Sequence, residues 1–109
     1  MVVYSQGDIV EVDFDPTKGH EPTKKRPALV VSSYDFNRST SMTVVCPIST
    51  CEKPFFLHEK LPGNLDMEGV VIMEQIRAID LEARQTRYLT HLSDEYLMPI
   101  IVCLKSFFD

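Results

Sequence analysis

The stretch Asp8-Ile9-Val10-Glu11-Val12-Asp13-Phe14-Asp15 alternates apolar and acidic side chains. An alternation with a period of two is typical of a β-strand that has one face in the protein core and the other in water. We therefore predict a one-sided strand over residues 8–15. Its apolar face carries Val10, Val12 and Phe14, and its acidic face carries Glu11, Asp13 and Asp15.

Further strands are predicted outward from this one. The runs at 28–32 and 42–48 are apolar and rich in β-branched residues, which is typical of central strands buried on both faces. The run at 70–73 leads into a segment where Ile76 and Ile79 cannot share one face of a straight strand, so we predict a bend there. The remaining predictions are a short strand at 55–59, a strand at 86–92, and a turn region over the polar residues 34–40.

Residues 93–108 have the pattern of an amphipathic helix. Ser93 precedes two acidic residues, a common helix start, and apolar residues then recur at helical spacing from Leu97 to Phe108. Pro99 lies beyond the first turn, where a proline clashes with the preceding turn, so we predict either a kink there or a later start. With 109 residues, 44% of them hydrophobic, the chain is predicted to form a single β-rich α+β domain over residues 1–109.

Basic residues gather between the first two predicted strands. Proline and glycine interrupt residues 16–26, which we predict to be a long connection, and long loops in compact domains are often functional. The formal net charge of −5 excludes a protein that binds nucleic acid over its whole surface, so any RNA site must be local. On charge alone, a solvated loop and a phosphate-binding loop are equally good interpretations. The basic residues are Lys18, Lys24, Lys25 and Arg26.

The cysteines and the apolar segments exclude several classes of protein. Cys46, Cys51 and Cys103 cannot all pair within one chain, and none has zinc-ligand spacing. We predict free thiols, with no metal and no cofactor. The first residues lack a basic region followed by a long apolar run, and no segment approaches membrane-spanning length, so we expect a cytoplasmic protein without membrane contact.

Four longer motifs follow one another in a recognisable order. They are Gly7-Asp8-Ile9-Val10-x-Val12-Asp13-Phe14-x-Pro16, Lys25-Arg26-Pro27-Ala28-Leu29-Val30-Val31-Ser32, Pro47-Ile48-Ser49-Thr50, and Gly69-Val70-Val71-x-x-Glu74-Gln75-Ile76-Arg77-x-Ile79-Asp80. Together they resemble the MazF/PemK toxins from Gly7 to about Leu92. The resemblance implies a small SH3-like β-barrel of the MazF/PemK/CcdB type, with short helices and a C-terminal helix. It also implies a homodimer, a metal-independent, sequence-selective endoribonuclease acting on single-stranded RNA, and a cognate MazE-like antitoxin.

The residues at two of these motifs suit RNA cleavage. RNA carries its own nucleophile, the ribose 2′-hydroxyl, so the protein must align it and stabilise the crowded phosphorane. The resemblance assigns catalysis to the arginine of the Arg-Pro pair, here Arg26, and to a threonine whose position is held by Ser49, with Thr50 adjacent. Serine keeps the hydroxyl but lacks the methyl group that restricts its rotamer. Because the pKa of a guanidinium lies above about 12, we assign charge stabilisation, not base catalysis, to Arg26.

The general base stays open among His20, His58, Glu74 and water. Some family members carry, at the position of Glu74, an aspartate to which a base role is attributed. As a structural carboxylate, Glu74 would equally pair with Arg77, Arg84 or Arg87. Tyr34 and Phe36 either stack on bases or pack in the core. The predicted RNA-binding residues are Lys18, His20, Lys24, Lys25, Asn37, His58 and Gln75, and the amides among them suit the edges of unstacked bases.

Two other functions stay open on the sequence. A gyrase poison shares this architecture but relies on an apolar tail with tryptophan, and this chain has no tryptophan. An inactive homologue that only binds its partner or RNA is the second alternative. We predict a toxin of a type II toxin–antitoxin system, which inhibits translation and growth and leaves 2′,3′-cyclic phosphate and 5′-hydroxyl ends.

Overall fold

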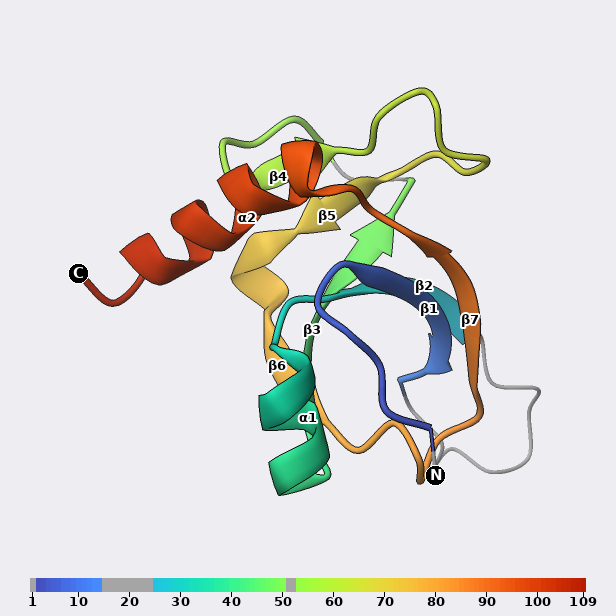
Figure 1. Cartoon of the computed structure of the whole chain (residues 1–109). Coiled ribbons are helices and arrows are strands. Elements are labelled where there is room, and N and C mark those ends of the chain that lie inside the picture. The colour runs from blue at the N-terminus through green and yellow to red at the C-terminus, as the bar shows by residue number, and fades with distance from the viewer. Residues whose placement is uncertain (1, 15–24, 51–52) are drawn as a thin grey trace.

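The computed structural model describes residues 2–14, 25–50 and 53–109. Within these residues, seven strands form one antiparallel sheet that is accompanied by two α-helices and one short 3-10 helix (Figure 1). The elements in chain order are β1 (Asp8–Asp13), β2 (Lys25–Val30), α1 (Tyr34–Thr40), β3 (Thr43–Ser49), β4 (His58–Lys60), β5 (Val70–Ile72), η1 (Met73–Gln75), β6 (Arg77–Ile79), β7 (Thr86–His91) and α2 (Asp94–Ser106).

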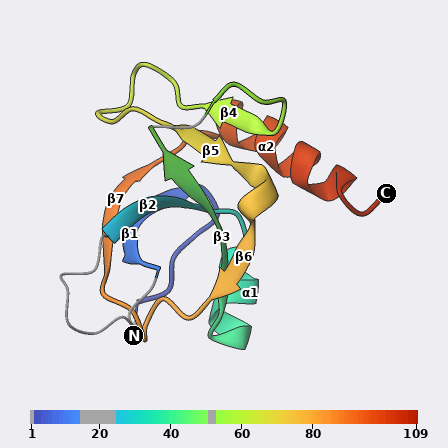
Figure 2. The ribbon, with the colours of Figure 1, turned by 180° about the vertical axis from the view of Figure 1, so that it is seen from behind.

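The strand order is β4-β5-β3-β2-β1-β7, and β6 also pairs with β3. Strands β2 and β3 lie in the middle of this order, as predicted for the two apolar runs. The sheet curves strongly, as the two opposite views show (Figures 1 and 2). Among the described strands no ladder joins β4 to β7, so the β-rich α+β class is confirmed but the barrel is open. The short helix η1 separates β5 from β6 and makes the predicted bend.

Apolar side chains form two core clusters, one on each face of the sheet. Helix α2 covers one face through Leu97, Ile100 and Leu104, and the other cluster lies inside the curve of the sheet. Strand β1 contributes to both, because Ile9 packs under α2 while Val10 and Val12 face the inner cluster. The prediction of a one-sided strand is therefore wrong at Ile9, and Asp13 is also buried.

Residues 34–40 form helix α1, so the predicted turn region is wrong. The Oγ atom of Ser33 caps the helix by accepting a hydrogen bond from the backbone N–H of Phe36 at 3.2 Å. The helix ends at Ser41, which adopts the left-handed conformation with φ 61°. Seven residues are too few to display an apolar period, and the one inward-facing side chain is the polar Asn37. The pattern on which helix prediction depends is therefore missing here.

Helix α2 begins at Asp94, close to the predicted start, and continues through Pro99. The proline ring is exposed to solvent, so water can replace the hydrogen bond that its missing N–H would have made. A later start is thus excluded. Among the described residues, neither α-helix combines the length and apolar character that a membrane crossing requires.

Candidate active site

Strands β2 and β3 place Arg26 and Ser49 at the same end of their ladder. Their antiparallel ladder pairs Ala28 with Pro47 and Leu29 with Cys46. Arg26 precedes this ladder by two residues and Ser49 follows it by two, so both side chains leave the same end of the paired region and face the same side of the sheet. Lys25 and Arg26 thus belong to a strand, not to the end of the predicted 16–26 connection, and Arg26 also pairs with Val12 of β1. The pairing with β1 fixes the backbone of Arg26.

On the other side of β3, Ser49 is aligned across the sheet with a second basic residue. Ser49 pairs with Val70 of β5, and Val70 pairs with Lys60 of β4. Directly paired residues point to the same face of a sheet, and neighbouring strands are about 4.8 Å apart. Ser49 and Lys60 therefore lie on one face, about 10 Å apart in a row across β3, β5 and β4, and Arg26 faces the same side from the start of β2. Sequence reasoning missed Lys60 because it lies in a strand of only three residues.

An open pocket of about 490 Å³ lies beside this row. Ser49, Thr50 and Lys60 line it, and the loop from Leu61 to Gly69 supplies most of the remaining wall. The Arg26 side chain is exposed and is not part of the wall. The pocket therefore lies on the β4 side of Ser49, and Lys60 is the basic residue in its wall.

His58 and Glu74 form a hydrogen-bonded pair next to the row. The His58 Nε2 atom lies 2.8 Å from the Oε2 atom of Glu74, and His58 Nδ1 lies 2.9 Å from the backbone oxygen of Lys53. His58 pairs with Ile72 of β5, two residues from Val70, so it faces the same side as Lys60 and Ser49. Each ring nitrogen of His58 faces an oxygen acceptor. A histidine donates a hydrogen bond from both ring nitrogens only when it is doubly protonated.

The three arginines that could have paired with Glu74 have other partners. Arg77 lies over the ring of Phe14, 5.3 Å from its centroid. Arg84 donates from Nη1 to the backbone oxygens of Asp13 and Phe14, at 3.0 and 2.6 Å. Arg87 bonds Glu11 at 3.2 Å. The prediction of an arginine partner for Glu74 is wrong, because η1 turns the carboxylate toward β4 and His58.

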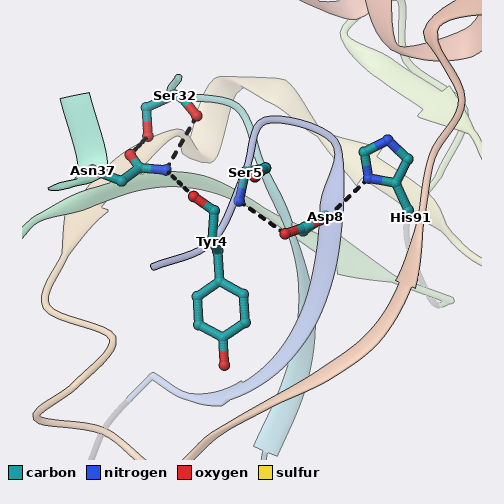
Figure 3. A network of polar contacts seen from close by, with 6 residues as sticks. All are labelled: Tyr4, Ser5, Asp8, Ser32, Asn37 and His91. Atoms are coloured by element: carbon teal, nitrogen blue, oxygen red, sulfur yellow. Dashed lines mark hydrogen bonds and ion pairs between the residues drawn. The ribbon is translucent and has the colours of Figure 1, made fainter. Parts of the chain in front are cut away.

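Asn37 belongs to the interior, not to the site. Its side chain is 4% exposed, and its Nδ2 atom donates to the backbone oxygens of Tyr4 and Ser32, at 2.8 and 3.3 Å (Figure 3). Its Oδ1 atom accepts a hydrogen bond from the Ser32 hydroxyl. With both ends of the amide engaged, Asn37 ties α1 to β2 and to the N-terminal segment. It presents no free edge to a base, which corrects its predicted role.

His91 also has a structural partner. Its Nδ1 atom lies 2.9 Å from Oδ1 of Asp8, and the other carboxylate oxygen accepts the backbone N–H of Ser5 at 2.8 Å (Figure 3). This carboxylate joins the start of β1 to the end of β7.

The other predicted site residues are scattered. Gln75 and Lys25 are exposed, and Lys25 pairs with Asp13 across the β1–β2 ladder. Tyr34 and Phe36 are exposed on α1, which excludes core packing for both. Lys18, His20 and Lys24, predicted to bind RNA, lie outside the described residues, as does Cys51. No group of three metal-ligating side chains occurs in the part of the chain that the structure describes.

Gly69 permits the close approach of β5 to Ser49. Its φ is +146°, and a Cβ atom there would lie 2.7 Å from Cγ2 of the buried Ile48 and 3.3 Å from the backbone oxygen of Ser49. We expect Gly69→Ala to lower the free energy of unfolding in urea by about 1–3 kcal/mol, through backbone strain and overpacking. Gly63→Ala is the matched control, because nothing lies within 4 Å of a Cβ atom there. Equal stability of the two variants would contradict this account.

The pKa of the buried Cys46 thiol depends on burial and on the charge of Glu74. Burial raises the pKa of the Cys46 thiol to about 12, and the negative charge of Glu74 adds to the shift. The folded state therefore binds the thiol proton more tightly than the unfolded state, whose thiol has a pKa of about 8.5. This contribution to stability is present at lower pH and is lost as the pH rises through the interval between those two pKa values.

We expect the stability of the wild type to fall above about pH 9, relative to Cys46→Val, by up to about 1.4 kcal/mol per pH unit. Urea unfolding of both proteins between about pH 8 and 10.5 measures the difference, since every other titrating group is shared. If the free energies of unfolding of the two proteins change in parallel with pH, Cys46 is not the source of the pH dependence.

Comparison with known proteins identifies the family. A family model described as the PemK-like, MazF-like toxin of type II toxin–antitoxin systems matches residues 5–108. The chain belongs to this MazF/PemK family. The order of the four motifs predicted this membership, which is thereby confirmed.

Several known relatives of the MazF/PemK family cover most of the chain. The endoribonuclease toxin MazF of Escherichia coli K12 is 38% identical over 82 residues, which are 75% of this chain and 73% of that protein. The endoribonuclease toxin ChpB of the same strain is 37% identical over 109 residues, covering 94% and 92% of the two chains. The endoribonuclease PemK of Escherichia coli is 34% identical, covering 88% and 75%.

Solved MazF structures share the fold. MazF of Deinococcus radiodurans, crystal form I, has a TM-score of 0.84 at 30% identity and covers 98% of this chain and 97% of its own. A MazE–MazF structure from the same organism, form II, has a TM-score of 0.82 at 28% identity, covering 98% and 96%. The open curved sheet with its covering helix is thus the MazF/PemK architecture.

Proposed function

We propose that this chain is a metal-independent endoribonuclease that cleaves single-stranded RNA as the toxin of a type II toxin–antitoxin system. The observation that carries the proposal is the position of Arg26 and Ser49 at the same end and on the same face of the β2–β3 ladder, in a chain of the MazF/PemK family. Thr50, Lys60 and the adjoining pocket support it, because they add hydroxyl and cationic groups on the same side.

The reaction needs only groups that the RNA and this face supply. The ribose 2′-oxygen attacks phosphorus, the bond to the 5′-oxygen breaks, and the products carry a 2′,3′-cyclic phosphate and a 5′-hydroxyl. The proton of the 2′-hydroxyl goes to a base, and the leaving 5′-oxygen gains a proton. Arg26 offers two parallel N–H donors to the phosphorane oxygens, and the Ser49 hydroxyl holds one of them in place.

Among the described candidates for proton transfer, Glu74 is better suited than His58. The His58 side chain is 8% exposed and both of its nitrogens are engaged, whereas the Glu74 side chain is 36% exposed. Within residues 2–14, 25–50 and 53–109, the Oε1 atom of Glu74 has no hydrogen-bond partner, so it can accept a proton from the 2′-hydroxyl or from a water between them. His58 then acts as a positioning residue for Glu74.

The proposal is tested by incubating the purified protein with a long single-stranded RNA in excess chelator and mapping both new ends. Discrete cuts that resist the chelator and leave 2′,3′-cyclic phosphate and 5′-hydroxyl ends are expected. Intact RNA in the presence of folded protein would reject the nuclease and favour the inactive homologue. Cuts that disappear with chelator would reject the metal-independent mechanism.

We further propose a homodimer in the cytoplasm that a MazE-like antitoxin inhibits. The resemblance to a MazE–MazF structure supports an antitoxin partner. Exposed apolar side chains on α2, namely Met98 and Val102, support a second copy as a neighbour. Sedimentation of the purified chain measures the dimer directly, and a monomer at all concentrations would reject it.

A further inference from the structure

Two adjacent phenylalanines are exposed on the β3–β4 connection. Phe56 is 81% exposed and Phe55 is 47% exposed. Their ring centroids are 4.8 Å apart, and the ring of Phe55 meets the ring of His58 edge-on at 5.2 Å. The three rings form one continuous aromatic surface, which begins at the His58–Glu74 pair and ends in solvent.

This surface is held by the backbone around it. The N–H of His58 donates to the Phe55 carbonyl at 2.9 Å and closes a turn, and the N–H of Met73 donates to the Leu57 carbonyl at 3.1 Å. The ring of His58 bonds the carbonyl of Lys53 at 2.9 Å, and Leu57 packs against the core under α2. The turn is therefore fixed with Leu57 inward and Phe56 outward, so little conformational entropy is lost when a ligand binds.

The surface lies within reach of the cleavage row. His58 is separated from β3 by one strand, β5, so its distance from the Ser49 side of the sheet is on the order of 10 Å. Lys60 follows two residues after His58 on the same face and can contact a phosphate between the two places. Successive bases of a single strand stack on aromatic rings of this kind, at about 1–3 kcal/mol per base.

We propose that Phe55 and Phe56 form a base-stacking platform for an unpaired nucleobase next to the scissile phosphate. The inference rests on the proposed RNA cleavage and deepens it, because it names where the flanking part of the substrate binds. Stacking tolerates every base, so the platform contributes affinity and register along the strand more than sequence discrimination. Phe56 is the larger contributor because it is 81% exposed, against 47% for Phe55.

The test uses a single-stranded RNA that contains the cut sequence mapped on the wild type, with a 2′-deoxy sugar at the scissile nucleotide so that it binds without being cleaved. One flanking base at a time is replaced by an abasic site, and the Kd is measured by fluorescence anisotropy. For one position, base removal should weaken binding to the wild type by about 5- to 150-fold. Phe56→Leu should weaken binding of the intact RNA by a similar factor. In that variant, removal of the same base should leave the Kd almost unchanged.

Phe108→Leu is the matched control, since that ring is 84% exposed beyond the end of α2. It should bind both RNAs as the wild type does. On cleavable RNA, Phe56→Leu should raise KM and leave kcat unchanged, the pattern expected when uniform binding is lost. An unchanged Kd for Phe56→Leu would overturn the platform while leaving the proposed cleavage intact. So would losses of affinity that multiply when Phe56→Leu is combined with removal of the base.

A different result is expected if the proposed RNA cleavage itself is wrong. If the wild type cuts no RNA, anisotropy with random-sequence single-stranded RNA replaces the mapped site. Weaker binding by Phe56→Leu than by Phe108→Leu then supports the platform in a protein that only binds RNA. Equal binding by both variants overturns it.

Discussion

Arg26→Ala should reduce kcat for RNA cleavage by about 10²- to 10³-fold, the loss that follows removal of a preorganised donor from a developing oxyanion. The side chain is exposed at the start of β2, on the same side of the sheet as Ser49, so its removal leaves the core untouched. Stability in urea should therefore stay at the wild-type value while cleavage is lost. Arg26→Lys should recover little, because an ammonium cannot offer two parallel donors to one phosphate.

Arg38→Ala is the control for a general loss of positive charge. Arg38 is exposed in the last turn of α1, away from the β2–β3–β5–β4 row. Initial rates at saturating RNA compare the three variants with the wild type. If Arg26→Ala and Arg38→Ala lose activity equally, long-range electrostatics would explain the effect and the direct role of Arg26 would be wrong.

Glu74→Gln should lower kcat by about 10²-fold or more, the contribution typical of a general base. Glutamine keeps an acceptor for the His58 Nε2 hydrogen bond and has almost the same shape, so the change isolates the basicity of the carboxylate. Glu59→Gln serves as the control, because Glu59 is an exposed carboxylate next to His58 in β4. Single-turnover rates with saturating enzyme separate this chemical step from RNA binding.

A double variant tests whether His58 acts through Glu74. His58→Gln alone should lower kcat less than Glu74→Gln, and adding it to Glu74→Gln should cause almost no further loss, because the two residues act as a unit. If the two losses multiply, His58 contributes independently and its assignment as a positioning residue is wrong.

Strand pattern and motif order made most of the architecture predictable. The apolar runs that became β2 and β3 were long enough to identify as central strands, and Ile76 and Ile79 indicated the bend that η1 makes. The two-sided burial of β1 could not be predicted, because the sequence does not say that α2 covers the second face over Ile9. Tertiary packing, not local alternation, decided the environment of that residue.

The candidate site was predicted in part. Arg26, Ser49 and Glu74 stood out in motifs, but their proximity depends on a register that joins segments far apart in the sequence. Lys60 and the two phenylalanines have no such signal, since their strand or turn is too short to show a pattern. Asn37 was predicted to bind RNA bases because it lies in a polar segment, where an amide is expected to be exposed. Only the structure shows that helix α1 buries it.

The position of α2 in the chain also has a consequence for synthesis. Every strand of the sheet precedes α2, yet Leu97, Ile100 and Leu104 close the apolar face that supports β3 and β5 beneath Ser49 and Val70. A growing chain therefore emerges from the ribosome with all of its strands before it gains the helix that stabilises them. The face that carries Ser49 therefore gains its full support only after α2 has been synthesised.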